Sequence, residues 1–83
     1  MTDDYQTNVY ETSVTVLGPD NRPTHPGDYR VFRAATSREA ARYALALYRR
    51  IYGTLRPVIE VRTWHQRDMR DSYNLFTPQE LND

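Results

Sequence analysis

The sequence predicts an α+β domain: a three- or four-stranded, mainly antiparallel sheet with one amphipathic helix on one face, in the order strand, strand, helix, strand. Two observations lead to this prediction, namely short stretches of alternating polarity and one stretch of helical periodicity with capping residues at both ends. The length of 83 residues suits one domain. We therefore divide the chain into a flexible N-terminus (1–8), a single domain (9–76) and a C-terminal tail (77–83) with at most one helical turn.

The first strand is predicted from Val9 to Leu17, where apolar and polar residues alternate. One face of this strand carries Tyr10, Thr12, Val14 and Val16. Residues 18–28 contain three prolines and two glycines, which predicts a long exposed loop. A second strand is expected from Tyr29 to Ala35, with Tyr29 and Val31 on one side and Arg30, Phe32 and Ala34 on the other.

Two more strands are expected after the helix. The run from Val58 to Trp64 alternates like a half-buried strand, and Pro57 stands just before it, where a missing amide is tolerated. Ser72 to Phe76 is expected to add a short edge strand. The pattern leaves open whether the second and third strands are neighbours or flank the first.

The helix is predicted from Ser37 to Tyr52. Thr36 and Glu39 have the spacing of a capping box, in which a hydroxyl and a carboxylate accept free amides at the helix start. Gly53 provides the left-handed residue that ends helices. A second capping box, Thr77 and Glu80, with proline between them, predicts the single turn in the tail.

The apolar arc of this helix is unusually wide. Its main face is expected to be Ala40, Tyr43, Ala44, Leu47, Tyr48 and Ile51. Ala41, Leu45 and Tyr52 extend it to about 200° at 100° per residue. Either loops or the C-terminal segment cover the extra sector, or it is a homodimer or partner surface. The second interpretation gives a candidate protein interface of Ala41, Leu45, Tyr48, Arg49 and Tyr52.

Composition favours binding over catalysis. All eleven basic residues are arginines and there are seven tyrosines; a GC-rich genome explains missing lysines, but arginine and tyrosine are also enriched at binding hot spots. The net charge is zero, yet residues 29–70 carry ten arginines against three acidic residues, a net charge of +7. This predicts a basic surface between acidic ends, unless the ends fold back and neutralise it.

Few residues are suited to catalysis or metal binding. The sequence has no cysteine, and its two histidines, His25 and His65, are forty positions apart. Only three glycines are present, so no phosphate-cradling loop is expected. We expect no enzyme activity, no cofactor and no metal. No apolar run approaches the length of a membrane span and the start is acidic, so we expect a soluble, cytoplasmic protein without membrane contact.

A nucleic-acid surface is the alternative to protein binding. Aromatic rings and arginines on one sheet face would suit a single strand, by stacking and by phosphate contact. The candidate residues are Arg30, Phe32, Arg62 and Trp64. The neutral overall charge argues against this alternative, because dedicated nucleic-acid domains are usually basic.

The sequence also resembles, in style rather than by a motif, small orphan accessory proteins of phages of GC-rich bacteria. The resemblance lies in the acidic Met1-Thr2-Asp3-Asp4 start, the arginine-only basic set and the helix opening from Thr36 to Ala41. It implies a cytoplasmic, dimeric protein that binds and modulates a host protein. Together these observations predict a non-catalytic protein-binding module that self-associates.

Overall fold

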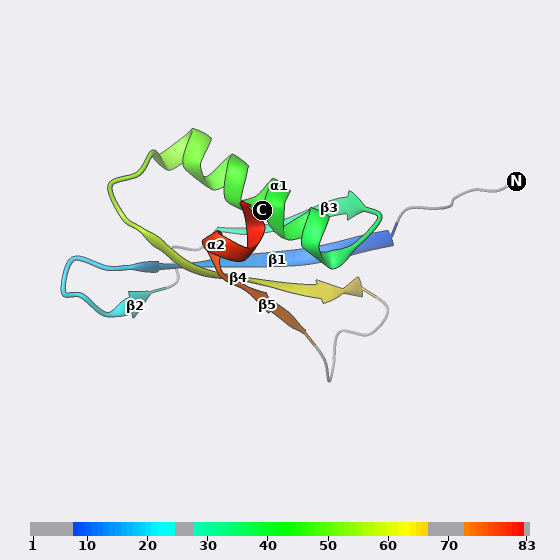
Figure 1. The fold of residues 1–83 in the computed structure, drawn as a ribbon, viewed down its shortest axis with the longest axis horizontal. Coiled ribbons are helices and arrows are strands. Elements are labelled where there is room, and N and C mark those ends of the chain that lie inside the picture. Colours follow the sequence, from blue (N-terminus) through cyan, green and yellow to red (C-terminus); the bar gives the residue numbers. More distant parts are fainter. Residues whose placement is uncertain (1–7, 25–27, 67–72, 83) are drawn as a thin grey trace, which may run out of the picture.

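A computed structural model of the chain describes residues 8–24, 28–66 and 73–82. The predicted flexible N-terminus falls outside this part of the chain except for Asn8, which begins the first strand. In these ranges the chain forms one antiparallel sheet and one main helix, which confirms the α+β prediction (Figure 1). No helix in these ranges is long and apolar enough to span a membrane.

The sheet is built around the first strand. Its strands are β1 (Asn8–Leu17), β2 (Pro23–Thr24), β3 (Tyr29–Ala34), β4 (Val58–His65) and β5 (Asn74–Phe76). β3 and β4 lie on either side of β1 and are antiparallel to it, and β5 pairs with the outer side of β4. The second and third predicted strands therefore flank the first.

The predicted loop contains a short strand, β2, which its content of proline and glycine did not predict. β2 pairs with Val16 and Leu17 at the end of β1. Gly18 donates its amide to the Arg22 carbonyl, and the turn between them places Asn21 at φ 60°. Proline is tolerated in β2 because the strand lies at a sheet edge. Residues 25–27 of the predicted loop lie outside the described ranges.

Strict alternation fails at the start of β4. Val14 lies opposite Val61 and Thr15 opposite Glu60, but Val16 lies opposite Val58, so β4 has one extra residue. Such a bulge reverses the side of the residues that precede it. Strict alternation would place Val58 on the same face as Trp64, but because of the bulge Val58 packs against the core.

The helix α1 (Ser37–Tyr52) has the predicted bounds and caps. Glu39 donates its amide to Thr36 Oγ1 at 3.1 Å, but its carboxylate accepts the amide of Ala35, at 2.9 Å, and not that of Thr36, so only the hydroxyl half of the predicted capping box is present. Gly53 has φ 73° and donates its amide to the Arg49 carbonyl. The C-terminal turn, α2 (Pro78–Leu81), has both bonds of its capping box.

The buried face of α1 is rotated relative to the main face expected from periodicity. The buried residues are Ala40, Ala41, Ala44, Leu45 and Tyr48. Tyr43 and Ile51 are instead 43% and 49% exposed, so their assignment to the core was wrong. The reason is that three of the buried positions are alanines, which allow the helix to approach the sheet closely, whereas the larger Tyr43 and Ile51 do not.

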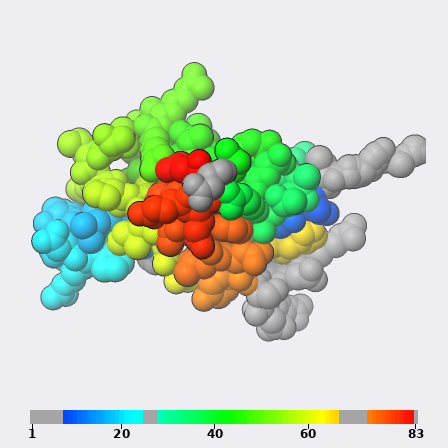
Figure 2. Space-filling model, viewed as in Figure 1, coloured from blue at the N-terminus to red at the C-terminus, as the bar shows by residue number. Residues whose placement is uncertain are grey.

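The C-terminal segment covers the wide apolar sector of the helix. Leu81 of α2 is 2% exposed and belongs to the same core cluster as Ala41 and Leu45, against which Phe76 also packs. Figure 2 shows the red C-terminal residues seated between α1 and β5. Of the two interpretations of that sector, coverage by the C-terminal segment is correct for Ala41 and Leu45.

Candidate protein interface

The interface predicted on the helix does not exist as one surface. Ala41, Leu45 and Tyr48 are at most 4% exposed within the single chain, while Arg49 and Tyr52 are exposed. All three belong to the core cluster, so a partner cannot contact them in this fold. The prediction is therefore wrong for these three residues, because the sequence pattern did not show which side of the helix packs on the sheet or that α2 covers Ala41 and Leu45.

The predicted nucleic-acid face is also divided. Arg30 lies opposite Thr12, and Phe32 opposite Tyr10, on the face covered by α1. Arg62 and Trp64 lie opposite Ser13 and Glu11, on the other face. We call these the helix face and the open face. The four candidate residues thus do not lie together, because the alternations of the two strands were matched in the wrong phase.

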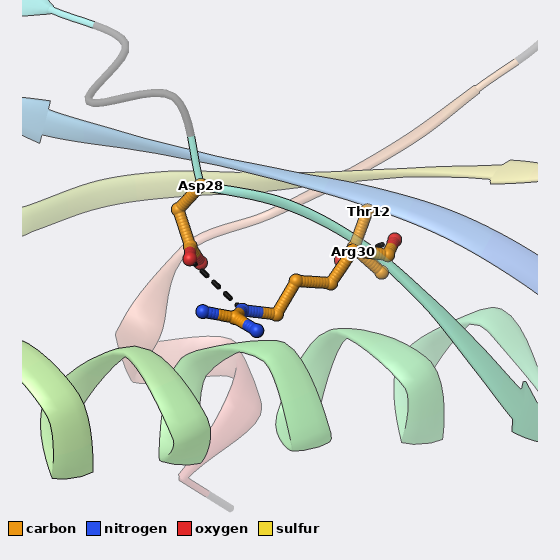
Figure 3. A network of polar contacts seen from close by, with 3 residues as sticks. All are labelled: Thr12, Asp28 and Arg30. Carbon is orange, nitrogen blue, oxygen red and sulfur yellow. Dashed lines mark hydrogen bonds and ion pairs between the residues drawn. The ribbon is translucent and has the colours of Figure 1, made fainter.

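Arg30 takes part in a polar network under the helix (Figure 3). Its Nε donates to Asp28 Oδ1 at 2.9 Å, and its carbonyl accepts the hydroxyl of Thr12. The Asp28 side chain is 2% exposed and its Oδ2 has no hydrogen-bond partner. The arginine therefore neutralises a buried carboxylate and has a structural role.

Tyr48 lies at the same end of the core. Burial raises the pKa of its hydroxyl above the ordinary value of 10.0; the charge of Arg56 lowers this pKa, whereas Asp28 raises it. Burial has the largest effect. Tyr48 also packs its ring against Tyr52, with 4.8 Å between the ring centroids. The hydroxyl is thus held in its neutral form in the folded chain.

The open face carries a group of exposed apolar side chains, which we call the open-face patch. Its members are Tyr29, Val31, Trp64, Tyr73 and Leu75. Four of them are 48–56% exposed, and Trp64 is half-buried. The register connects them across the sheet: one row runs Val31, Glu11, Trp64, and the next runs Tyr29, Ser13, Arg62, Leu75.

Contacts among the aromatic and charged side chains hold part of the patch in place. Trp64 and Tyr73 have ring centroids 6.2 Å apart, and the Arg62 guanidinium lies 5.1 Å from the centre of the Tyr73 ring. Arg62 also donates to Glu60 at 3.2 Å. This cluster is a preformed amphipathic surface, with flat rings beside a planar cation, and such surfaces are typical of the centres of protein interfaces.

One edge of the patch is an unpaired strand. Among the described residues β3 pairs with β1 alone, in a register without a bulge. On the helix face of β3 lies the exposed Tyr43 of α1, whose ring contacts that of Phe32, with 5.9 Å between the ring centroids. Tyr43, Leu47 and Ile51 share one helix face, which we call the α1 strip. Apolar surface thus lies on both sides of the β3 edge.

The hollows among the described residues offer less. One of 520 Å³ follows the start of α1 and is lined by Thr36, Arg38, Glu39, Arg42, Tyr43 and Ala46. Its carboxylate, that of Glu39, is already bonded at the helix start. In the described ranges no three His, Asp or Glu side chains gather as metal ligands would. The exposed patch and edge are therefore the better candidate site.

The important residues that sequence reasoning missed are those of the open face. Tyr29 and Val31 were placed together on one side of their strand, but the opposite side was taken as the accessible one. Tyr73 lies just before, and Leu75 within, a strand of three residues, which is too short for a clear alternation.

No protein-family model, curated protein or solved structure was found to match the chain.

Proposed function

We propose that this protein is a small non-catalytic protein-binding module that modulates a cellular protein, and that it uses the open-face patch as its contact surface. The observation that carries the proposal is the row of half-exposed aromatic and aliphatic side chains beside Arg62. Tyr29 and Val31 of β3 lie on one side of Glu11 and Ser13, and Trp64 and Leu75 lie on the other side. Exposed apolar side chains gathered on one face in this way are typical of interaction surfaces.

The arrangement supports protein binding better than nucleic-acid binding. Of the two arginines on the described open face, Arg62 is bonded to Glu60, which leaves Arg33, and the acidic Glu11 of the same face is buried. A single strand needs unpaired cations along its phosphates. A protein partner instead benefits from a mixed polar and aromatic surface, where charges of both signs find partners.

The test is affinity capture from lysate of the cells that produce the protein. The tagged wild type is compared with Leu75→Glu, which places a charge in the patch, and with Leu55→Glu, whose position is 92% exposed in the loop after α1. We expect one or more proteins to be retained by the wild type and by Leu55→Glu and lost with Leu75→Glu.

Equal retention by all three proteins would contradict the proposal. Binding of labelled single-stranded oligonucleotides to the wild type at low salt, weakened at higher salt and by Arg62→Glu, would favour the nucleic-acid alternative. An origin among phage accessory proteins, with a host protein as the partner, is compatible with this function and remains a proposal.

A further inference from the structure

The edge of β3 has the properties of a strand that pairs with another strand. β3 is six residues long, whereas β2 and β5 have two and three. Natural sheets protect exposed edges with prolines, bulges, very short strands or charged side chains. Between Tyr29 and Ala34, β3 has no proline and no bulge; its charged residues are Arg30, which is bonded to Asp28, and Arg33. Among the described residues the outer edge of β3 is therefore regular and unpaired, so a further strand can pair with it.

The backbone groups that point outward can be identified from the ladder with β1. Val14 donates its amide to the Asp28 carbonyl, so residues 14 and 28 form a hydrogen-bonded pair. Such pairs alternate along an antiparallel ladder, so Arg30 and Phe32 also direct their amide and carbonyl groups to β1. Tyr29, Val31 and Arg33 direct theirs away from it, toward the unpaired edge.

We propose that this edge pairs with β3 of a second copy of the chain, antiparallel and about a two-fold axis at Val31. This inference rests on the proposed function and deepens it by naming one partner and its contact. In this register Val31 lies opposite Val31 of the second copy, and Tyr29 lies opposite Arg33. Each of these three residues exchanges its outward amide and carbonyl with the residue opposite.

The side chains are complementary in this register. On the open face an arginine faces a tyrosine ring on each side of the apolar centre, a favourable cross-strand pair. On the helix face Arg30 lies opposite Phe32 of the second copy. An axis at Arg30 would instead set two arginines against each other. An axis at Phe32 would set Val31 against Arg33 and pair the two Phe32 rings, but it would lose both tyrosine–arginine pairs and would place residues with inward backbone groups at the axis.

The two-fold also accounts for the α1 strip. Pairing at β3 joins the two sheets and brings the two helices onto the same side of the joined sheet. Tyr43, next to Phe32 at the β3 edge, then faces the second copy, and Leu47 follows one turn later. One symmetric contact therefore covers the exposed apolar side chains next to the β3 edge on both faces of the sheet.

The experiment measures mass by light scattering and sedimentation from about 1 µM to about 1 mM, the range of weak to moderate association. We expect the wild type to dimerise. Val31→Glu brings two carboxylates together at the axis and should weaken the dimer at least about a hundredfold. Leu55→Glu is the control, since Leu55 is 92% exposed in the loop after α1 and is not a member of the open-face patch. It should dimerise like the wild type.

A second variant keeps the test valid if Val31→Glu fails to fold by circular dichroism. Arg33→Pro removes an amide that points outward and leaves the ladder with β1 intact. It should be monomeric. A wild type that stays monomeric up to about 1 mM would overturn the pairing, as would a dimer that resists the folded variants or is broken by Leu55→Glu. A monomer that still retains a cellular protein would overturn the pairing alone and leave the proposed function standing.

Discussion

Arg30 and Arg62 show how one residue type has different roles on the two faces of the same sheet. The buried carboxylate of Asp28 costs free energy unless a cation and hydrogen bonds compensate it. Arg30 provides both, at 2.9 Å, with its side chain only one-third exposed. Arg62 makes the same contact two residues along its own strand, with Glu60, but on the open face and nearer to water.

This difference predicts unequal effects for two matched substitutions. Arg30→Met leaves Asp28 buried without its cation and should lower the free energy of unfolding by about 2 kcal/mol. Arg62→Met removes a more exposed pair and should change it by less than about 0.5 kcal/mol. Urea unfolding of both variants measures this. Adding Asp28→Asn to Arg30→Met should restore part of the loss, and equal losses for the two single variants would contradict the assignment.

Tyr48 gives the fold a dependence on alkaline pH. Because burial raises its pKa in the folded chain above 10.0, the unfolded chain loses this proton first as pH rises. The associated stability is complete below pH 10 and is lost as pH rises through the folded-state pKa. Tyr48→Phe should therefore show a shallower decline of stability above pH 10 than the wild type, measured by urea unfolding at a series of pH values. Identical declines would contradict this.

At the scale of elements, α2 has an effect out of proportion to its length. Its four residues are stabilised by the capping box, in which Thr77 donates its amide to Glu80 at 2.7 Å. This turn places Leu81 over the sector of α1 that the sheet leaves uncovered. The element that decides whether α1 has a free apolar face is thus at the far end of the chain.

Leu81→Ala should therefore destabilise the domain by about 2–4 kcal/mol, as expected for a fully buried leucine. Leu55→Ala is the matched control, because that side chain is 92% exposed and its loss should be close to neutral. Thermal or urea unfolding of the two variants makes the comparison. A small effect at Leu81 would mean that the tail is not docked on α1.

The elements also show how far sequence reasoning extends. Local signals, such as the caps at Thr36 and Gly53, predicted the bounds of α1 correctly, because capping depends on neighbouring residues. Which side of α1 is buried depends on contacts with residues distant in sequence, namely those between its alanines and the sheet and those with Leu81. Periodicity alone placed Tyr43 in the core, whereas the structure leaves this side chain exposed.

At the scale of the whole molecule, the phase of β3 relative to β4 decides which residues form a site. Alternation alone places Tyr29 and Val31 together on one side of β3, and Arg62 and Trp64 together on one side of β4, and the structure has both pairs in this arrangement. Which sides face α1 depends on the shared neighbour β1, through pairings that no local pattern contains. For this reason the helix interface and the nucleic-acid face were wrong, and the open-face patch was missed.

The central claim is that the outward backbone groups of β3 pair with those of a second copy. Hydrogen exchange followed by NMR at about 10 µM and about 1 mM reports on these groups one amide at a time. The amides of Tyr29, Val31 and Arg33 should exchange rapidly in dilute solution and slowly in concentrated solution. Those of Arg30 and Phe32, which point to β1, should be protected in both. Rapid exchange of the outward three at both concentrations would contradict the account.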